Sequence, residues 1–341
     1  MSWLVSAARH FRSAVAAPTL PGMTMNDPSS RGLAIEVRDL SKFYGSVQAV
    51  RGVSFEVARG EVFCLLGPNG AGKTSVVEIL EGYRTRSGGE ARVLGIDPAA
   101  GARSLHERLG IVLQQCGVQT DLTVRELIEM YGRYYTRGRP VDELIELVDL
   151  GEKRDVRAKD LSGGQLRRLD LALALVGDPE LVFLDEPTTG FDPAARRGAW
   201  STVRSLCDLG KTIFLTTHYM DEAQFLADRV AVMSAGRIIA SGRPAELGGR
   251  DLRPAEIRFR LPREWSLGDL PDVPGERSIE DDSVLVVTRE PVLAASRITG
   301  WAIERGAELG HFSVNQPTLE DIYLELTGSL EQRRVNEEVA A

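Results

Sequence analysis

The sequence has few cysteines and histidines and no long apolar run. Its three cysteines are an odd number, and no two of them form a C-x-x-C pair. This pattern favours reduced thiols over a disulfide framework. The four histidines lie far apart in the sequence, so they give no support to a metal site. No stretch approaches about 18 consecutive apolar residues, and we therefore expect no membrane-spanning helix.

The chain also lacks an excess of positive charge. It contains 41 lysines and arginines against 49 aspartates and glutamates, which gives a net charge of −8. This balance argues against nucleic acid as the main partner. The composition, with 43% hydrophobic and 26% charged residues, is that of a globular protein. A length of 341 residues is enough for one large domain and one small one.

A glycine-rich segment at residues 67–75 reads GPNGAGKTS and fits the pattern G-x-x-x-x-G-K-[ST]. The apolar run before it predicts a buried parallel strand, and the residues after it have helical spacing. Glycines let successive backbone N–H groups face one concavity, a lysine supplies charge for the outer phosphates, and a threonine hydroxyl suits Mg²⁺. We therefore expect this loop to bind ATP with Mg²⁺ through Gly67, Pro68, Asn69, Gly70, Ala71, Gly72, Lys73, Thr74 and Ser75.

Two adjacent acids follow a second apolar run. Residues 181–184 predict a central strand of a parallel sheet, and Asp185 and Glu186 come directly after them. Ligands of such sheets bind beyond the carboxyl ends of the strands. Neighbouring side chains on a strand point to opposite sides, so we expect the two acids to differ in role. Asp185 is the expected Mg²⁺ ligand, and Glu186 the expected general base for the attacking water.

The segment LSGGQ lies between these two motifs. Ser162 is a good residue for a helix N-cap, and Gly163 and Gly164 leave the N–H groups of the first turn open to a phosphate. With Gln165, these residues form a second phosphate-binding helix end. Because the first loop fills its own site, this second end is expected to address the nucleotide of another copy, as in a two-fold dimer.

In this order, the three motifs resemble those of the ATP-binding subunit of an ABC transporter. The resemblance implies an α/β P-loop cassette, with a mostly parallel sheet, an antiparallel β subdomain and an inserted helical subdomain. A break in composition near LGGRDLRP predicts that a small α+β domain follows the cassette. We expect a disordered tail over 1–32, the cassette over 33–248 with the helical subdomain over about 115–177, the C-terminal domain over 249–328 and a frayed tail over 329–341.

The resemblance also implies roles for single residues. In the segment TTGFDP, Phe191 stands next to Asp192, at a position where the family more usually has a leucine. The implied roles are stacking on adenine for Tyr44, bridging of Mg²⁺ and the membrane partner for Gln114 (the first of two adjacent glutamines), communication between the two sites for Asp192, and contact with the terminal phosphate for His218.

The C-terminal residues show the order strand, strand, helix, strand, helix. The closing run PTLEDIYLELTG resembles the end of drug-resistance-type ABC ATPases, where this tail assists dimerisation and regulation. A packing appendage without regulatory effect is the other interpretation. At the other end of the chain, the first residues are either a disordered tail or a short amphipathic membrane-surface segment.

These observations predict an ATP-hydrolysing motor of an exporter at the cytoplasmic face of a membrane. A separate polytopic permease would carry a drug, antibiotic, lipid or polysaccharide, and a second copy of this chain or a paralogue would complete the ATP-bound dimer. The alternatives are a soluble ABC ATPase that acts on ribosomes or nucleic acid, an importer motor, and a nucleotide sensor without enzymatic activity.

Overall fold

The computed structural model describes residues 32–101, 103–112, 119–262, 264–280 and 282–325. Gln114 lies outside these residues. So do the two expected tails, except for Gly32. Within the described part of the chain, no helix combines the length and the apolar character that crossing a membrane requires.

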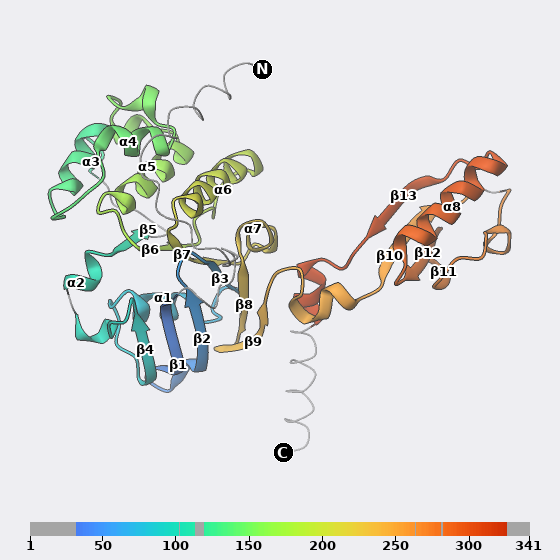
Figure 1. The fold of residues 1–341 in the computed structure, drawn as a ribbon, viewed down its shortest axis with the longest axis horizontal. Helices are drawn as coiled ribbons and strands as arrows, with labels where there is room; N and C mark the ends of the chain where they lie inside the picture. The colour runs from blue at the N-terminus through green and yellow to red at the C-terminus, as the bar shows by residue number, and fades with distance from the viewer. Residues whose placement is uncertain (1–31, 102, 113–118, 263, 281, 326–341) are drawn as a thin grey trace, which may run out of the picture.

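A six-stranded sheet forms the centre of the molecule (Figure 1). In the spatial order β5-β6-β7-β3-β8, each strand runs parallel to its neighbour. β9 forms the edge as the antiparallel hairpin partner of β8. β3, β6 and β7 are almost entirely buried because both faces of the sheet are covered. The strand order is β5 (Leu109–Val112), β6 (Leu181–Asp185), β7 (Thr212–Thr217), β3 (Val62–Leu66), β8 (Arg229–Ser234) and β9 (Arg237–Gly242).

One face of this sheet packs against the helix that follows the glycine loop and against a small antiparallel sheet. Phe63 and Phe214 point to this side, and their ring centroids are 5.6 Å apart. Phe55 of the small sheet stacks on Phe63 at 5.2 Å. The elements of this layer are α1 (Lys73–Leu80), β1 (Leu33–Tyr44), β2 (Val47–Ala58) and β4 (Gly88–Val93), with strand order β2-β1-β4.

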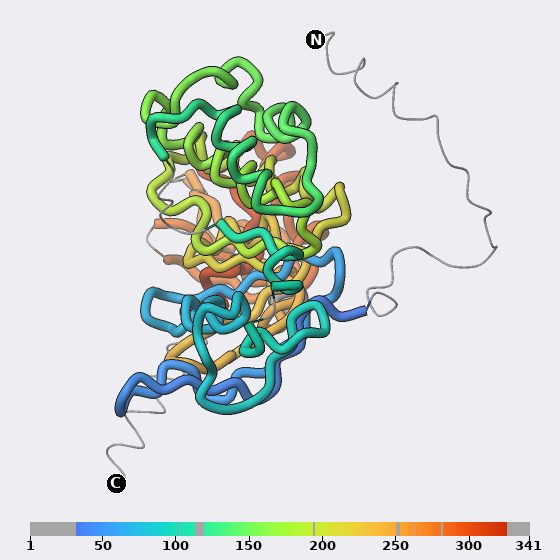
Figure 2. The backbone as a smooth tube through the Cα atoms, turned by 90° about the vertical axis from the view of Figure 1, so that its left-hand side faces the viewer, coloured from blue at the N-terminus to red at the C-terminus, as the bar shows by residue number. Residues whose placement is uncertain are grey.

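Helices cover the other face. Cys64, Leu184 and Leu215 belong to the core on this side, together with residues of α5, α6 and α7. The helical subdomain continues this layer and lies at the opposite end of the cassette from the small sheet, as both views show (Figures 1 and 2). Its helices are α3 (Val124–Gly132), α4 (Val141–Leu147) and α5 (Gly163–Leu175), and α6 (Pro193–Asp208) and α7 (Met220–Leu226) lie beside them. Short turns η3 (Pro98–Ala100), α2 (Arg103–His106), η4 (Gly151–Lys153) and η5 (Ala158–Asp160) connect these parts.

The C-terminal residues form a separate antiparallel sheet covered by one helix. Ile298 and Trp301 of α8 pack with Phe259 and Val286 in a core of their own. One strand of this sheet was not predicted: β11 is exposed along its whole length and carries charged residues, so it lacks the apolar alternation that indicates a strand. The strand order is β11 (Glu276–Glu280), β12 (Ser283–Thr288), β10 (Ala255–Arg260) and β13 (Gly310–Asn315). In the chain, η6 (Leu247–Leu252) precedes β10, η7 (Leu267–Asp269) lies between β10 and β11, and α8 (Pro291–Arg305) lies between β12 and β13.

After this domain the chain returns to the cassette. Residues 319–325 are helical, and Leu319 and Ile322 are buried. Leu319 belongs to the helical-side core of the cassette. Ile322 covers Gly248, where an added Cβ would lie 2.5 Å from its side chain. Residues 319–325 therefore pack against the cassette.

Candidate active site

The candidate site lies where the carboxyl ends of three neighbouring strands meet. β3 leads into the glycine loop, β6 ends at Asp185, and β7 ends one residue before His218. Main-chain hydrogen bonds join these ends: Gly67 N–H donates to the Thr217 carbonyl at 3.2 Å, and Glu186 N–H to the Thr216 carbonyl at 3.1 Å. The parallel sheet thus brings together residues that are far apart in the sequence.

Two positions of the loop require glycine, one because a side chain would clash and one because its backbone is left-handed. A Cβ on Gly67 would lie 2.2 Å from the carbonyl oxygen of Met233 in β8. Gly72 has a φ of 102°, in the left-handed region, and directly precedes α1. The loop can therefore lie close against the sheet while α1 begins at Lys73.

The side chain of Lys73 is folded into the loop and is only 4% exposed. Its Nζ donates to the carbonyl oxygens of Gly67 at 2.7 Å and Pro68 at 3.2 Å. The same Nζ lies 3.3 Å from Oε1 of Glu186. The buried ammonium is therefore balanced by the carboxylate directly after β6.

Glu186 occupies the centre of the site. Its Oε2 lies 3.2 Å from Nδ1 of His218 and accepts a hydrogen bond of 3.1 Å from the Thr189 hydroxyl. Strand alternation is not what separates Asp185 from Glu186, and their expected difference in role stays a prediction. β6 ends at Asp185, and Glu186 leaves the strand with a φ of 47°. This left-handed backbone costs about 1–2 kcal/mol in a residue with a Cβ, and it turns the carboxylate toward Lys73 and His218.

The carboxyl groups around the loop differ in pKa. Burial raises the pKa of Asp185, although the Thr216 hydroxyl that donates to it acts in the opposite direction. Burial would also raise the pKa of Glu186, but the charges of Lys73 and His218 outweigh it and hold that pKa below its usual value. Glu81, just after α1, has its pKa raised to about 8 by burial and by the charge of Asp185.

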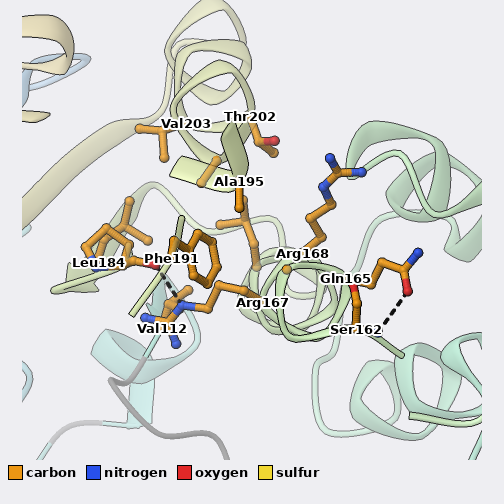
Figure 3. Close-up of a pocket in the computed structure, with 14 residues that line it drawn as sticks. Val112, Ser162, Gln165, Arg167, Arg168, Leu184, Phe191, Ala195, Thr202 and Val203 are labelled. Atoms are coloured by element: carbon orange, nitrogen blue, oxygen red, sulfur yellow. Dashed lines mark hydrogen bonds between the residues drawn. The ribbon is translucent and has the colours of Figure 1, made fainter. Parts of the chain in front are cut away.

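The LSGGQ segment begins α5 as expected, away from the glycine loop. Ser162 and Gln165 form a capping box, with Ser162 N–H donating to the glutamine Oε1 at 2.9 Å. A Cβ on Gly163 or Gly164 would meet nothing within 4 Å, so the first turn of α5 is open. A cavity of about 280 Å³ separates α5 from α6, and none of the residues that line it in Figure 3 comes from the glycine loop. Since α1 and α5 pack on opposite faces of the sheet, the two helix ends do not share a site within one chain.

Known families match both parts of the chain. The ABC transporter family matches residues 50–189, and the C-terminal domain of ABC transporter domain-containing-like proteins matches residues 255–318. Nod factor export ATP-binding protein I of Rhizobium meliloti (strain 1021) is 41% identical over 305 residues, covering 87% of this chain and 88% of the relative. The daunorubicin/doxorubicin resistance ATP-binding protein DrrA of Streptomyces peucetius is 38% identical over 332 residues, covering 93% of this chain and 98% of the relative.

The chain belongs to the ABC transporter ATP-binding family. A crystal structure of the ADP conformation of an ATP-binding cassette of an ABC transporter is similar to it with a TM-score of 0.56 at 25% identity, covering 63% of this chain and 92% of that one. The expected family and fold class are confirmed. Members of this family bind and hydrolyse ATP, so the chain is an ATPase.

Tyr44 of the cassette lies at the end of β1, beside the glycine loop. Its hydroxyl oxygen is 3.0 Å from Oγ of Ser75, and its ring is 39% exposed. Lys42 and Arg84 each place a positive charge 5.2 Å from the ring centroid. The exposed, electron-rich ring is compatible with the predicted stacking on adenine. Arg84 was not predicted as part of this surface, because nothing in the sequence indicates that residues 42 and 84 meet.

Asp192 begins α6 of the cassette. Its Oδ1 accepts a hydrogen bond of 2.9 Å from Ala195 N–H, so the residue acts as an N-cap within its own chain. Phe191, the residue in place of the more usual leucine, lines the cavity between α5 and α6 (Figure 3). A role of Asp192 between the two sites of a dimer stays a prediction.

Four threonines of the site were not predicted from the sequence. The Thr216 hydroxyl donates to the Asp185 carboxylate and accepts a hydrogen bond from Glu186 N–H. The Thr189 hydroxyl donates to the Glu186 carboxylate. Thr188 and Thr217 are the sequence neighbours of these two threonines. Their signal is the pair of TT dipeptides, one directly after the acidic motif and one directly before the histidine. Short hydroxyl side chains at strand ends can donate to a neighbouring carboxylate without the entropy cost of a long side chain.

Proposed function

We propose that this chain is the ATP-hydrolysing subunit of an exporter that works at the cytoplasmic face of a membrane with a separate polytopic permease. The observation that carries the proposal is the position of the Glu186 carboxylate between the Lys73 ammonium and the His218 imidazole, at the edge of the sheet where the glycine loop begins. A carboxylate between a phosphate-binding lysine and a histidine suits a general base for the water that attacks the terminal phosphate.

Oxygen donors for Mg²⁺ lie beside the loop. The Asp185 carboxylate ends β6, and Thr74 directly follows Lys73 in α1. A carboxylate and a hydroxyl are donors that a hard cation prefers, and a cation would relieve the cost of ionising the buried Asp185. We assign both residues to Mg²⁺, which when bound neutralises phosphate charge. The third expected ligand, Gln114, lies outside the described residues.

ATP binding changes the partners of Lys73. The ammonium now contacts two loop carbonyls and Glu186, whereas a triphosphate offers it charged oxygens in greater number. As Lys73 turns toward the phosphates, the ammonium that now lies 3.3 Å from Glu186 moves away from it. The pKa of Glu186 then rises from its lowered value, and the carboxylate becomes a stronger base when a water is to be activated. His218 remains beside it for contact with the terminal phosphate.

The open end of α5 is assigned to the nucleotide of a second copy or a paralogue. Within one chain, α1 and α5 lie on opposite faces of the sheet, and among the described residues no atom lies within 4 Å of a Cβ built on Gly163 or Gly164. In a closed two-fold dimer, each copy presents Ser162–Gln165 to the glycine loop of the other. Closure would bring Asp192 of one copy near the site of the other and change the surface offered to the permease.

The class of transported molecule is proposed from the relatives. One of them is named for export of Nod factor and another for resistance to daunorubicin and doxorubicin. We propose that the permease of this chain likewise moves a drug, antibiotic, lipid or polysaccharide outward. The chemistry described above is common to all of these, because substrate contacts would lie on the permease.

The change Glu186→Gln tests the proposed base. ATP turnover is expected to fall roughly 10²- to 10⁴-fold, the range for general-base catalysis. Nucleotide affinity is expected to be retained, because the loop and Lys73 are intact and the competing carboxylate charge is gone. Phosphate release and nucleotide titration measure the two quantities. Turnover at the wild-type rate would show that Glu186 is not the base.

The same variant tests the partners. With MgATP, the full-length Glu186→Gln chain is expected to run as a dimer in size-exclusion chromatography, since hydrolysis no longer reopens it. An affinity-tagged wild-type chain is expected to co-purify with a polytopic membrane protein from detergent-solubilised membranes. A chain that stays monomeric with saturating MgATP and its membrane partner contradicts the dimer, and co-purification with ribosomes or DNA instead contradicts export.

A further inference from the structure

The buried carboxyl group of Glu222 links two segments of the site. Glu222 lies in the first turn of α7 and is 0% exposed. Its Oε1 accepts a hydrogen bond of 2.8 Å from the Thr188 hydroxyl and another of 3.0 Å from the indole N–H of Trp200. A fully buried carboxylate costs several kcal/mol in desolvation unless polar groups compensate it. An apolar side chain would avoid this cost, so the two donors point to a geometric role.

The first segment that Glu222 holds is the turn between the base and the start of α6. Thr188 lies two residues after Glu186, and its carbonyl accepts a hydrogen bond of 3.1 Å from Phe191 N–H. The next residue, Asp192, caps the helix that carries Trp200. Both donors to Glu222 therefore belong to the turn and helix that fix Asp192.

The second segment is the end of β7. Glu222 lies four residues after His218. Between them, Tyr219 N–H donates to the Thr217 hydroxyl at 3.0 Å. The Thr217 carbonyl accepts from Gly67 at the start of the glycine loop. A shift of α7 would therefore reach His218, and a shift of the 188–192 turn would reach α7 through Glu222.

We propose that Glu222 is a positioning residue that holds the Thr188–Asp192 turn and the His218 segment in one mutual arrangement. The proposal rests on the roles proposed above for Glu186, His218 and Asp192. Through this contact, a displacement of Asp192 by a second copy moves His218 relative to Glu186. The linkage affects the hydrolysis step, while ATP binding by the loop and Tyr44 does not depend on it.

Three variants separate this linkage from a purely structural role. Thr188→Val removes one hydroxyl at nearly constant volume, and Glu222→Leu removes the acceptor. Glu222→Gln keeps an Oε1 that can accept both hydrogen bonds. Thr202→Val is the matched control, since its hydroxyl on α6 donates to the Gly198 carbonyl, outside the linkage. For each full-length variant, kcat and KM for MgATP, affinity for a fluorescent ATP analogue, and Tm are measured.

Thr188→Val and Glu222→Leu are each expected to lower kcat about ten-fold, the effect of about 1.4 kcal/mol, with KM and analogue affinity within about two-fold of wild type. Glu222→Gln is expected to restore most of the rate, and Thr202→Val to keep all of it. The double variant Thr188→Val/Glu222→Leu is expected to be no slower than Glu222→Leu alone, because both changes break the same contact.

The inference is overturned if Thr188→Val lowers Tm without lowering kcat, or if its effect adds in full to that of Glu222→Leu. Should Glu222→Leu fail to fold, Thr188→Val together with Glu222→Gln still decides the matter. Glu186→Gln in the same assay distinguishes a failure of the Glu222 linkage from a failure of Glu186 as the proposed base. If it is inactive while Thr188→Val retains the wild-type rate, only the linkage fails, and if it is fully active, the proposed base fails first.

Discussion

The described contacts of Lys73 are with oxygen atoms of its own chain. The ammonium is buried and lies against Gly67, Pro68 and Glu186. A buried cation needs such partners, because an unpaired charge in the interior is strongly unfavourable. The same partners make Lys73 available for exchange, since two neutral carbonyls compete poorly with phosphate oxygens. In the proposed site, bound ATP would replace these internal contacts of Lys73.

Replacing Lys73 by alanine is expected to weaken binding of MgATP roughly 10- to 150-fold. The reason is the loss of at least one charge-assisted hydrogen bond, which contributes about 1.5–3 kcal/mol. Calorimetric titration of the purified chain measures the affinity. Lys211→Ala is the control, because Lys211 pairs with Asp178 beyond the opposite end of β7. If the affinity of Lys73→Ala is within two-fold of wild type, Lys73 does not bind the phosphates.

Single residues of the site were predictable where chemistry demands a residue type at a fixed spacing. The lysine and glycines of the loop and the acid pair are of this kind, and the structure brings Lys73, Asp185, Glu186 and His218 to one edge. The left-handed backbone of Glu186 was not predictable, because it follows from contacts with β7 rather than from local sequence. The same holds for the buried linkage of Glu222, whose donors are distant in the chain.

At the scale of elements, the end of α1 carries an unusual carboxyl group. Glu81 follows the last residue of the helix, is 2% exposed, and has an Oε1 without a hydrogen-bond partner among the described residues. Burial and the charge of Asp185 raise its pKa to about 8. Its value in the unfolded chain is near 4.5, so the folded protein binds this proton more tightly. Between these two values, the stability of the fold decreases as pH rises.

Glu81→Gln is therefore expected to stabilise the nucleotide-free protein at pH 8.5 and to change little at pH 5. The gain at high pH is on the order of 1–4 kcal/mol, since each pKa unit corresponds to about 1.4 kcal/mol and partial relaxation reduces the total. Urea unfolding at both pH values, with Mg²⁺ removed by chelation, measures the difference. A gain that is equal at pH 5 and pH 8.5 would mean that packing, and not the proton, is responsible.

Elements with a strong local signal were predictable, and those that depend on tertiary packing were not. The apolar runs at 62–66, 181–184 and 212–217 are strands, and Ser162 caps α5 as expected. β11 escaped prediction because its residues are exposed and largely charged, and because its place at the sheet edge follows from pairing with β12. The pattern of apolar residues reports burial, so a strand that is not buried gives no such signal.

At the scale of the whole molecule, the chain leaves the cassette after β9, builds the C-terminal sheet and returns. Figure 1 shows this domain standing apart from the cassette, joined to it near β9. The returning helix of residues 319–325 places Leu319 in the cassette core and Ile322 over Gly248. An ion pair between Arg253 and Glu325 adds a contact at the same junction. The cassette is therefore completed by residues from beyond the C-terminal domain.

This arrangement predicts that the returning helix stabilises the cassette. Ile322→Ala is expected to lower the free energy of unfolding by about 2–4 kcal/mol, through lost burial and the cavity left over Gly248. Ile303→Ala is the matched control, because Ile303 is 81% exposed on α8 and should change stability by less than about 0.5 kcal/mol. Hydrogen exchange should rise most in η6 and β9, which lie at the junction. If exchange in Ile322→Ala rises instead within β10–β13 alone, the helix stabilises the C-terminal domain and not the cassette.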